Sequence, residues 1–205
     1  MLDATDRTGS LDPALDAARA GHESGIAELW RALNPPILRY LRVVVGESAE
    51  DVASETWLHA AREIHQFRGD AAGFRVWLFR VARHRALDEL RRVGRRREDP
   101  AGLDAADERV ARDDPAAEAL ERFTTRRALG MIAGLPPDQA EAVMLRVVAG
   151  MDVAQTASVL GKRPGAVRIA TMRGLRRLAA NLEAGNAGAA GSASSSARNA
   201  KEVAE

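Results

Sequence analysis

Six basic side chains and no acidic one lie between Lys162 and Arg177. Basic side chains can neutralise DNA phosphates, and a helix that carries them on one face fits a DNA groove. The apolar spacing indicates such a helix, with Val167 on the packing face and Arg168 and Arg173 toward the opposite side. We predict DNA binding here; a solvated face, an anionic membrane or an acidic partner helix are the alternatives. The predicted packing stripe comprises Val167, Leu175, Leu178 and Leu182.

The segment before the basic helix predicts a helix-turn-helix. Asp152 suits an N-cap with Gln155 three residues later, and Gly161 suits the left-handed residue that ends this first helix. Pro164 suits the first turn of the second helix. Another helix, from Pro136 to Val148, precedes the pair. We therefore expect a compact DNA-binding domain of three helices.

A second group of residues combines aromatic and basic side chains on a helix predicted at about residues 72–92. Aromatic rings and arginines together can hold single-stranded DNA, because rings stack on unpaired bases and arginines bind phosphates. One face of this helix is apolar and is expected to pack in the core: Phe74, Trp77, Leu78 and Val81. The side chains better placed for solvent or nucleic acid are Phe79, Arg80, Arg83 and His84.

The residue types needed for metal or thiol chemistry are scarce. There is no cysteine, which excludes disulfides, thiolate zinc sites and cysteine nucleophiles. The four histidines show no metal-binding spacing, and Glu55 with His59 is an isolated pair. An all-helical enzyme that uses Glu55, His59 or His84 for acid-base work gains no support from a nucleophile, a metal motif or a phosphate loop. We expect no metal and no cofactor.

The elements that must position these residues are helices, and no strand pattern competes with the helical spacing. One helix is expected from Leu15 to Leu33, interrupted at Gly21 and ended by Asn34, Pro35 and Pro36. Three more are expected at 37–45, 49–67 and 72–92. The third of these four helices carries an exposed acidic face with Asp51 and Glu55.

Charge is segregated along the chain, although its net value is only +1. Residues 80–97 hold eight arginines against Asp88 and Glu89, whereas residues 98–121 hold nine acidic residues against Arg109 and Arg112. The acidic stretch also contains prolines and glycine and few large apolar residues. It is typical of a linker between two basic modules.

The 205 residues allow one domain or two small ones. The predicted fold is all-α, with two helical domains joined by an acidic flexible linker and a helix-turn-helix, winged-helix-like domain at the C-terminal side. No apolar run approaches the length that a bilayer needs, and the N-terminus lacks a secretory pattern, so a cytoplasmic protein is expected. The expected divisions are a flexible N-terminus at 1–10, a first domain at 11–93, the linker at 94–118, the second domain at 119–184 and a disordered tail at 185–205.

Three segments, in this order, resemble the extracytoplasmic-function (ECF) group of bacterial sigma factors in the sigma-70 family. SAEDVASETWLHAAREIHQF (48–67) is similar to the helix that binds core RNA polymerase in this family. FRVWLFRVARHRALDELRR (74–92) is similar to the helix that engages the −10 promoter element. LPPDQAEAVMLRVVAGMDVAQTASVLGKRPGAVRIATMRGLRRL (135–178) is similar to the −35-binding domain.

The resemblance implies functions for particular residues. Asp51, Ser54, Glu55 and Leu58 would meet the clamp helices of the largest polymerase subunit, and the second domain would meet the polymerase flap. The residues expected at the −10 element are Arg80, Arg83, His84, Asp88 and Arg91, together with Phe79 from the reading of the helix itself. The residues expected at the −35 element are Arg163, Ala166, Arg168, Ile169, Met172 and Arg173, together with Arg176 on the same basic face.

The chain departs from the common pattern of this family at two places. His84 stands where asparagine is common, which changes the expected base preference. The run Gly165 to Ala170 replaces the common glycine-threonine-valine-lysine-serine-arginine, so that direct readout of the −35 element is expected to differ from that of relatives.

The implied function is promoter-specific initiation by a dissociable, non-catalytic subunit that works with core RNA polymerase, promoter DNA and an anti-sigma protein. The acidic linker would either imitate RNA in the polymerase cleft or serve as a solubilising tether. The alternative function is a stand-alone helix-turn-helix repressor or activator, which predicts a symmetric dimer on a palindromic operator without polymerase.

Overall fold

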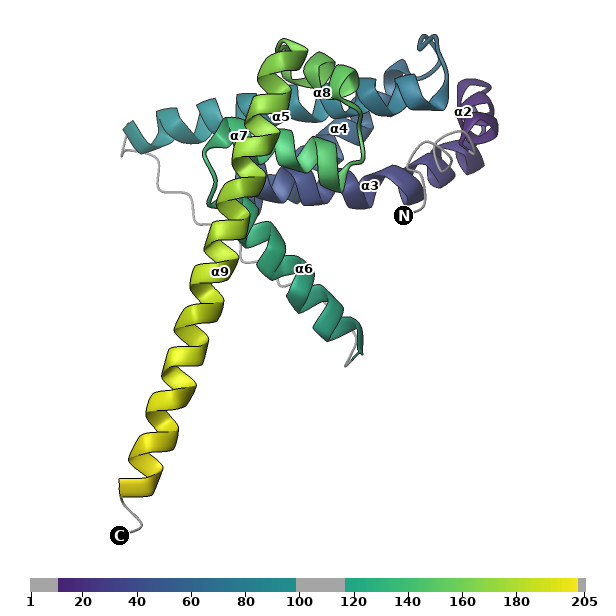
Figure 1. The fold of residues 1–205 in the computed structure, drawn as a ribbon. Coiled ribbons are helices and arrows are strands. Elements are labelled where there is room, and N and C mark those ends of the chain that lie inside the picture. Colours follow the sequence, from purple (N-terminus) through teal and green to yellow (C-terminus); the bar gives the residue numbers. More distant parts are fainter. Residues whose placement is uncertain (1–10, 99–116, 203–205) are drawn as a thin grey trace.

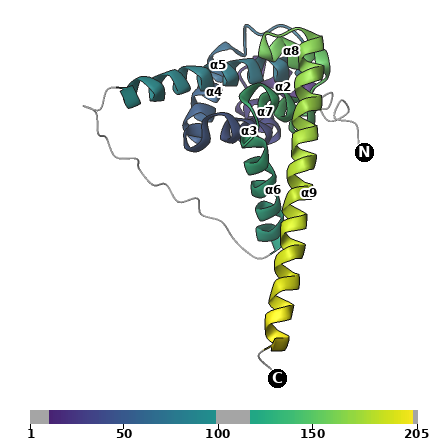
Figure 2. The same cartoon turned by 60° about the vertical axis from the view of Figure 1, so that its left-hand side comes forward.

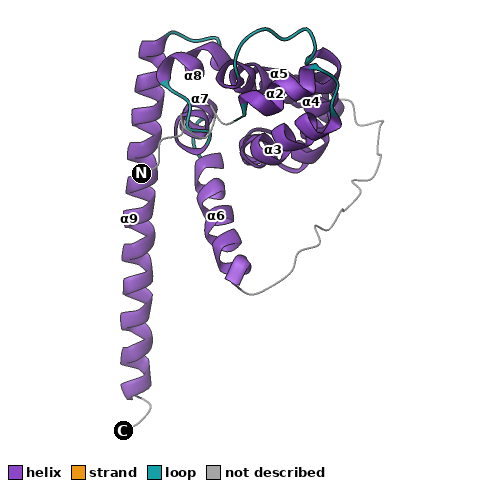
Figure 3. Cartoon of the chain, turned by 90° about the vertical axis from the view of Figure 1, so that its right-hand side faces the viewer, coloured by secondary structure: helices purple, strands orange, loops and turns teal. Residues whose placement is uncertain are grey.

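The computed structural model describes residues 11–98 and 117–202. Every element within these ranges is helical, and no strand occurs among them (Figure 3). The all-α prediction is therefore confirmed, and the described part of the second domain has a helix-turn-helix without a β-wing. No helix in these two ranges is long and apolar enough to cross a membrane.

The helices of the first half form a layered bundle, shown in Figure 1. They are α2 (Asp12–Arg19), α3 (Glu23–Val45), the 3-10 turn η1 (Gly46–Ser48), α4 (Ala49–Glu63) and α5 (Ala71–Glu98). The second half contains α6 (Ala117–Ala133), α7 (Pro137–Val143), the π-helical turn η2 (Met144–Val148), α8 (Val153–Leu160) and α9 (Pro164–Glu202).

Helix α3 continues through Pro35 and Pro36, where the sequence predicted a break between two helices. Proline removes a backbone donor and usually ends a helix. Here tertiary packing outweighs that cost, because Leu33 and Ile37 are buried on either side of the prolines. Asn34 is also buried, and its Oδ1 accepts a hydrogen bond of 3.0 Å from the Trp57 indole Nε1. The prediction of a helix end at Asn34 was wrong.

Helices α4 and α5 have shifted ends relative to the prediction. Helix α4 ends at Glu63 rather than at residue 67, and α5 runs to Glu98 rather than to about residue 92. Two carboxylates fix the start of α5. The Gly73 amide donates to Asp70 Oδ1 at 2.7 Å, and the Ala71 amide donates to Asp12 Oδ1 at 2.7 Å. Asp12 belongs to α2, so a side chain of α2 caps the start of α5.

The helix-turn-helix forms as predicted. Asp152 and Gln155 make a reciprocal capping box, with bonds of 2.7 and 3.0 Å between side chains and backbone amides. Gly161 adopts φ +64°, the left-handed conformation expected at the end of α8. The predicted packing stripe of α9 is only partly correct. Val167 is buried and Leu178 half-buried, but Leu175 and Leu182 are exposed.

Helix α9 continues to Glu202 and extends away from the body of the molecule, as Figures 1 and 2 show. The composition of residues 185–205 predicted a disordered tail instead. Alanine has the highest helix propensity, and extending a helix that is already nucleated costs little. The packed N-terminal part of α9 supplies that nucleus. The predicted acidic linker falls largely on residues 99–116, which lie outside the described residues.

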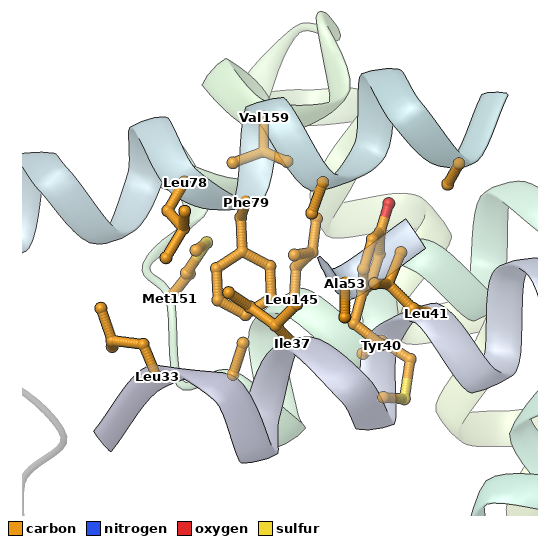
Figure 4. Close-up of a cluster of buried hydrophobic side chains, with 14 of the residues drawn as sticks. Leu33, Ile37, Tyr40, Leu41, Ala53, Leu78, Phe79, Leu145, Met151 and Val159 are labelled. Atoms are coloured by element: carbon orange, nitrogen blue, oxygen red, sulfur yellow. The ribbon is translucent and has the colours of Figure 1, made fainter. Parts of the chain in front are cut away.

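Both halves of the chain contribute to one continuous apolar core. Figure 4 shows side chains of α3 and α5 facing side chains of the second half. Ile37 and Phe79 come from the first half, whereas Leu145, Met151 and Val159 come from η2, the following loop and α8. The predicted domains therefore pack against each other in this structure.

Candidate nucleic-acid interface

The basic face of α9 is open to solvent. Ile169 and Met172 are 48% and 44% exposed and lie among the arginines of this face. No ion pair joins the arginines of this face to another residue whose side chain the structure describes. Such a face, with apolar side chains between free guanidinium groups, can contact both phosphates and base edges. The exposed residues of this face are Arg163, Ala166, Arg168, Ile169, Met172, Arg173 and Arg176.

The helix-turn-helix holds this face in place from behind. Gly174 is buried against α7, and a Cβ at this position would lie 2.8 Å from Val143 Cγ2. Lys162, at the turn, forms an ion pair with Asp138 of α7. Lys162 is therefore engaged within the domain, whereas the arginines that follow it are free to contact a ligand.

The acidic face of α4 forms a second exposed surface. Leu58 is 58% exposed, and it lies one turn after Glu55 and two turns after Asp51 on the outside of the bundle. Ser54 is exposed as well, with its hydroxyl donating to the Glu50 carbonyl at 2.9 Å. The opposite side of α4, with Val52, is buried. The four residues predicted for polymerase binding thus share one solvent-exposed face.

The third predicted surface, on α5, is only partly open. His84, Asp88 and Arg91 form a local network with side-chain distances of 3.2 Å and 2.9 Å to the central Asp88. Both His84 and Arg91 are largely exposed. The sequence predicted these three residues for the −10 element, and that assignment stays a prediction.

Phe79 was wrongly predicted to be available for nucleic acid. Its side chain is fully buried and packs edge-on against Tyr40, with 5.8 Å between the ring centroids. Helical periodicity alone placed it beside Arg80 and Arg83, but the second half of the chain covers that side of α5. Phe79 therefore belongs to the core that joins the two halves.

Arg80 and Arg83 contact the second half of the chain. The Arg80 guanidinium donates to the Ser158 hydroxyl of α8 at 3.0 Å. The Arg83 guanidinium makes a forked ion pair with Glu141 of α7, at 3.2 to 3.3 Å. The Tyr40 hydroxyl donates to the same carboxylate at 3.1 Å.

Sequence reasoning missed Tyr40 and Glu141. Glu141 is only 7% exposed, between the buried Ala140 and Ala142. The signal was available in the sequence, because Glu141 has the helical spacing of the buried positions Met144 and Leu145. A carboxylate on the apolar side of a helix calls for a cationic partner.

The surroundings of Tyr40 shift its ionisation. Burial, followed by the neighbouring Glu141 carboxylate, raises the pKa of Tyr40 well above its ordinary value, and Arg83 opposes this effect. On the exposed end of α5, hydrogen bonding to Glu89 raises the pKa of Arg92. Burial lowers the pKa of Arg75.

The histidines occupy unrelated places. His59 stacks on Trp77, with ring centroids 5.9 Å apart, and His84 joins the network around Asp88. No three histidine, aspartate or glutamate side chains among the described residues gather closely enough to hold a metal ion.

Comparison with known proteins places these surfaces in a family. Residues 29–96 match Sigma-70 region 2, and residues 125–178 match Sigma-70, region 4. The acidic face of α4 and the arginines at 80, 83 and 91 of α5 lie in the first match, and the basic face of α9 lies in the second. The chain thus has the two regions of a sigma-70-type protein.

Two related proteins identify the group of sigma-70 proteins to which the chain belongs. The ECF RNA polymerase sigma factor SigD of Mycobacterium tuberculosis is 33% identical over 181 residues, covering 85% of this chain and 84% of its own. BldN of Streptomyces coelicolor, another ECF sigma factor, is 32% identical over 167 residues, covering 80% and 63%. The chain belongs to the ECF group of RNA polymerase sigma factors. It directs promoter-specific transcription.

Solved structures share the fold. CnrH in complex with the cytosolic domain of CnrY matches 85% of this chain and 98% of its own, with a TM-score of 0.60 and 21% identity. The sigma factor RpoE of Bartonella quintana, solved with the anti-sigma factor NepR, matches 77% and 96%, also with a TM-score of 0.60 and 20% identity.

Proposed function

We propose that three exposed surfaces divide the work of initiation. The acidic face of α4 binds core RNA polymerase, the arginine side of α5 holds the melted −10 element, and the basic face of α9 enters the major groove at the −35 element. The observation that supports this assignment most strongly is the free arginine face of α9, which the buried Gly174 and Val167 hold on a rigid support.

The face of α4 suits a basic protein partner. Asp51 and Glu55 supply negative charge, and the exposed Leu58 on the same face supplies an apolar side chain for a partner to contact. Charged groups at an interface steer association and fix its register, whereas a central apolar side chain adds affinity. The clamp helices of the largest polymerase subunit are the proposed partner.

The surfaces of α5 and α9 suit different forms of DNA. Arg163, Arg168, Arg173 and Arg176 can contact phosphates along a groove, and Ile169 and Met172 can contact base edges. On α5, arginines and His84 can hold the backbone and a splayed base of a single strand. Stacking of one unpaired base on His84, worth about 1–3 kcal/mol, would offset part of the few kcal/mol that unstacking that base costs.

The protein acts as a binding subunit and catalyses nothing itself. We place it in the cytoplasm, on the nucleoid when it is part of the holoenzyme. An anti-sigma protein that covers the face of α4 and the basic face of α9 would control it; RpoE, a sigma factor of similar fold, was solved with the anti-sigma factor NepR. Simultaneous binding of such an inhibitor and core polymerase to the chain would contradict this arrangement.

Run-off transcription with purified core RNA polymerase on a genomic promoter library tests the proposal. With this protein, sequenced transcripts should begin at discrete sites that share two upstream elements. The double variant Asp51→Lys/Glu55→Lys should lose these starts because it reverses the charge of the polymerase-binding face. The matched control Glu23→Lys/Glu28→Lys reverses two exposed charges on α3 and should keep them.

Two results would contradict the proposal. Starts that survive charge reversal on α4 would remove that face from polymerase binding. No starts at all, together with tight binding of the protein alone to a palindrome, would favour a stand-alone repressor or activator instead.

A further inference from the structure

Arg92 lies at the edge of the acidic face of α4. Helices α4 and α5 pack against each other, and Arg92 belongs to the exposed end of α5. Hydrogen bonding to Glu89 is the main cause that raises the pKa of Arg92, followed by the charge of Glu89. The charges of Glu55 and Asp51 raise it further, against the opposing effect of burial. The field of both acidic residues therefore reaches this guanidinium.

Glu89 fixes the position of Arg92. Its Oε2 accepts from Arg92 Nε at 2.7 Å, and its Oε1 accepts from Arg92 Nη2 at 3.0 Å. The Ser48 hydroxyl, in η1 directly before α4, donates to the same Oε1 at 3.0 Å. The side chain of Glu89 is only 11% exposed, whereas that of Arg92 is 54% exposed. One carboxylate thus anchors an accessible guanidinium beside the first turn of α4.

Arg92 points away from the side of α5 that is proposed to bind DNA. Arg80, His84 and Arg91 recur at intervals of four and seven residues, so they share one side of the helix. Arg92 follows Arg91 directly and is therefore about 100° further around the axis. This direction, together with the contact through Glu89 to Ser48, assigns Arg92 to the α4 side of the helix.

A cation at this edge restricts which proteins can bind the acidic face. Basic side chains that pair with Asp51 and Glu55 also come close to Arg92, and like charges brought together in an interface are strongly unfavourable. A partner that places a carboxylate at this edge avoids the repulsion and gains a charge-assisted hydrogen bond. The anchored guanidinium loses little conformational entropy when it forms that bond.

We propose that Arg92 determines the specificity of the polymerase-binding face by pairing with an acidic side chain of the clamp helices, and that Glu89 is its positioning residue. The inference rests on the proposed function of α4. The partner surface then has mixed charge, with basic groups opposite Asp51 and Glu55 and a carboxylate at the α5 edge. A helix that carries basic groups alone is rejected.

Competition binding of the full chain to purified core RNA polymerase tests the role of Arg92. Arg92→Gln should weaken binding about threefold, because it removes one ion pair. Arg92→Glu should weaken it at least about tenfold, because it places a like charge against the partner carboxylate. Arg126 is an exposed arginine on α6, in the other half of the chain. Arg126→Gln and Arg126→Glu make the same changes of net charge and should leave the affinity nearly unchanged.

A double-mutant cycle tests the positioning role of Glu89. Glu89→Gln keeps the size of the side chain but loses the charge that makes the bonds to Arg92 strong, so it should weaken polymerase binding. In the Arg92→Gln background the same change should cause no further loss, because no guanidinium remains to be positioned. Losses that add would show that Glu89 acts by another route and would overturn its positioning role.

A charge swap identifies the partner carboxylate. Each acidic side chain of the clamp helices is changed to lysine, one at a time, and the resulting polymerases are titrated with Arg92→Glu. One of them should recover most of the tenfold loss, and the same polymerase should bind the parent less tightly. A set of polymerases in which none restores binding of Arg92→Glu would overturn the proposed pair.

The outcomes separate the role of Arg92 from the proposed function of α4. Unchanged or tighter binding of Arg92→Gln would overturn the inference, because a cation that only repels basic groups gives tighter binding when it is removed. If Asp51→Lys/Glu55→Lys still loses its transcript starts, that result leaves α4 as the polymerase-binding face. Starts that survive in Asp51→Lys/Glu55→Lys would instead contradict the function of α4 itself.

Discussion

Glu141 and Tyr40 place polar groups inside an otherwise apolar contact. A buried carboxylate is costly unless it is paired and hydrogen-bonded, and here it has both kinds of partner. Such groups restrict the ways in which two surfaces can pack, because any other register leaves them unpaired. At the scale of single residues, the contact between the halves is thus specified by three side chains, Tyr40, Arg83 and Glu141.

Tyr40 provides a pH-dependent signal of this arrangement. Below its ordinary pKa of about 10 the phenol is protonated in both folded and unfolded chains. Above that pH the unfolded chain releases the proton while the folded protein, with its raised pKa, retains it, so that stability falls as pH rises. Because the chain has one tyrosine, absorbance at the phenolate band should report a midpoint above about 10.

The variant Tyr40→Phe tests whether the Tyr40 hydroxyl causes stability to fall as pH rises. It should remove this part of the loss of stability between neutral and alkaline pH, as measured by urea unfolding at several pH values. A phenolate midpoint near 10 in the folded protein, or an unchanged alkaline loss in Tyr40→Phe, would show that the hydroxyl is not held as described.

At the scale of elements, sequence reasoning succeeded where the signal is local. The capping box at Asp152 and the left-handed Gly161 depend on a few neighbouring residues, and they form as predicted. Sequence reasoning failed where residues far apart in the chain determine helix ends or burial. Pro35 remains inside α3 because side chains around it are buried, and Phe79 is buried because the second half covers it. Neither contact partner can be read from local spacing.

Gly25 lies at a close approach between α2 and α3. A Cβ at this position would lie 2.4 Å from the Ala18 nitrogen and 2.5 Å from the Ala14 carbonyl oxygen, both on the backbone of α2. Gly25→Ala should therefore lower the free energy of unfolding by at least about 1–3 kcal/mol, because the backbones of α2 and α3 must move apart.

Gly130→Ala is the matched control for this prediction, measured in the same urea titration. Gly130 lies inside α6, and a Cβ there meets no atom within 4 Å. Alanine should leave stability unchanged or raise it by up to about 1 kcal/mol. Equal stability of Gly25→Ala and the parent would mean that α2 does not pack on α3 at this distance.

At the scale of the whole molecule, the sequence predicted the two halves but not their contact. Apolar spacing identified the helices of each half, and the charge pattern separated them. The closed arrangement depends on Tyr40 and Arg83 of one half meeting Glu141 of the other, which are 101 and 58 residues away along the chain. The domain boundaries remain predictions, since residues 99–116 are outside the described part.

The charge of the assembled DNA-binding surfaces predicts a salt dependence. If about six phosphates are neutralised, the affinity of the holoenzyme for its promoter should fall with a log–log slope near −5 against salt concentration. Arg168→Ala removes one free guanidinium of α9 and should make the slope less steep by about 1. Binding measured at four or more salt concentrations gives both slopes.

Arg62→Ala is the control for the salt experiment, because Arg62 is exposed on α4, away from the proposed DNA-binding faces. It should keep the slope of the parent. A slope for Arg168→Ala equal to that of Arg62→Ala would remove α9 from the phosphate contacts.

The cap that α2 places on α5 attaches the N-terminal end of α5 to the bundle. Asp12 and the packed rings of Phe67, Phe74 and Trp77 clamp its N-terminal end to the bundle. Near the opposite end, residues 90–95 are mostly exposed. Helix α5 is thus held at its N-terminal end and exposed beyond Leu90, so a load on the exposed end would act on the N-terminal attachment with the leverage of the intervening turns.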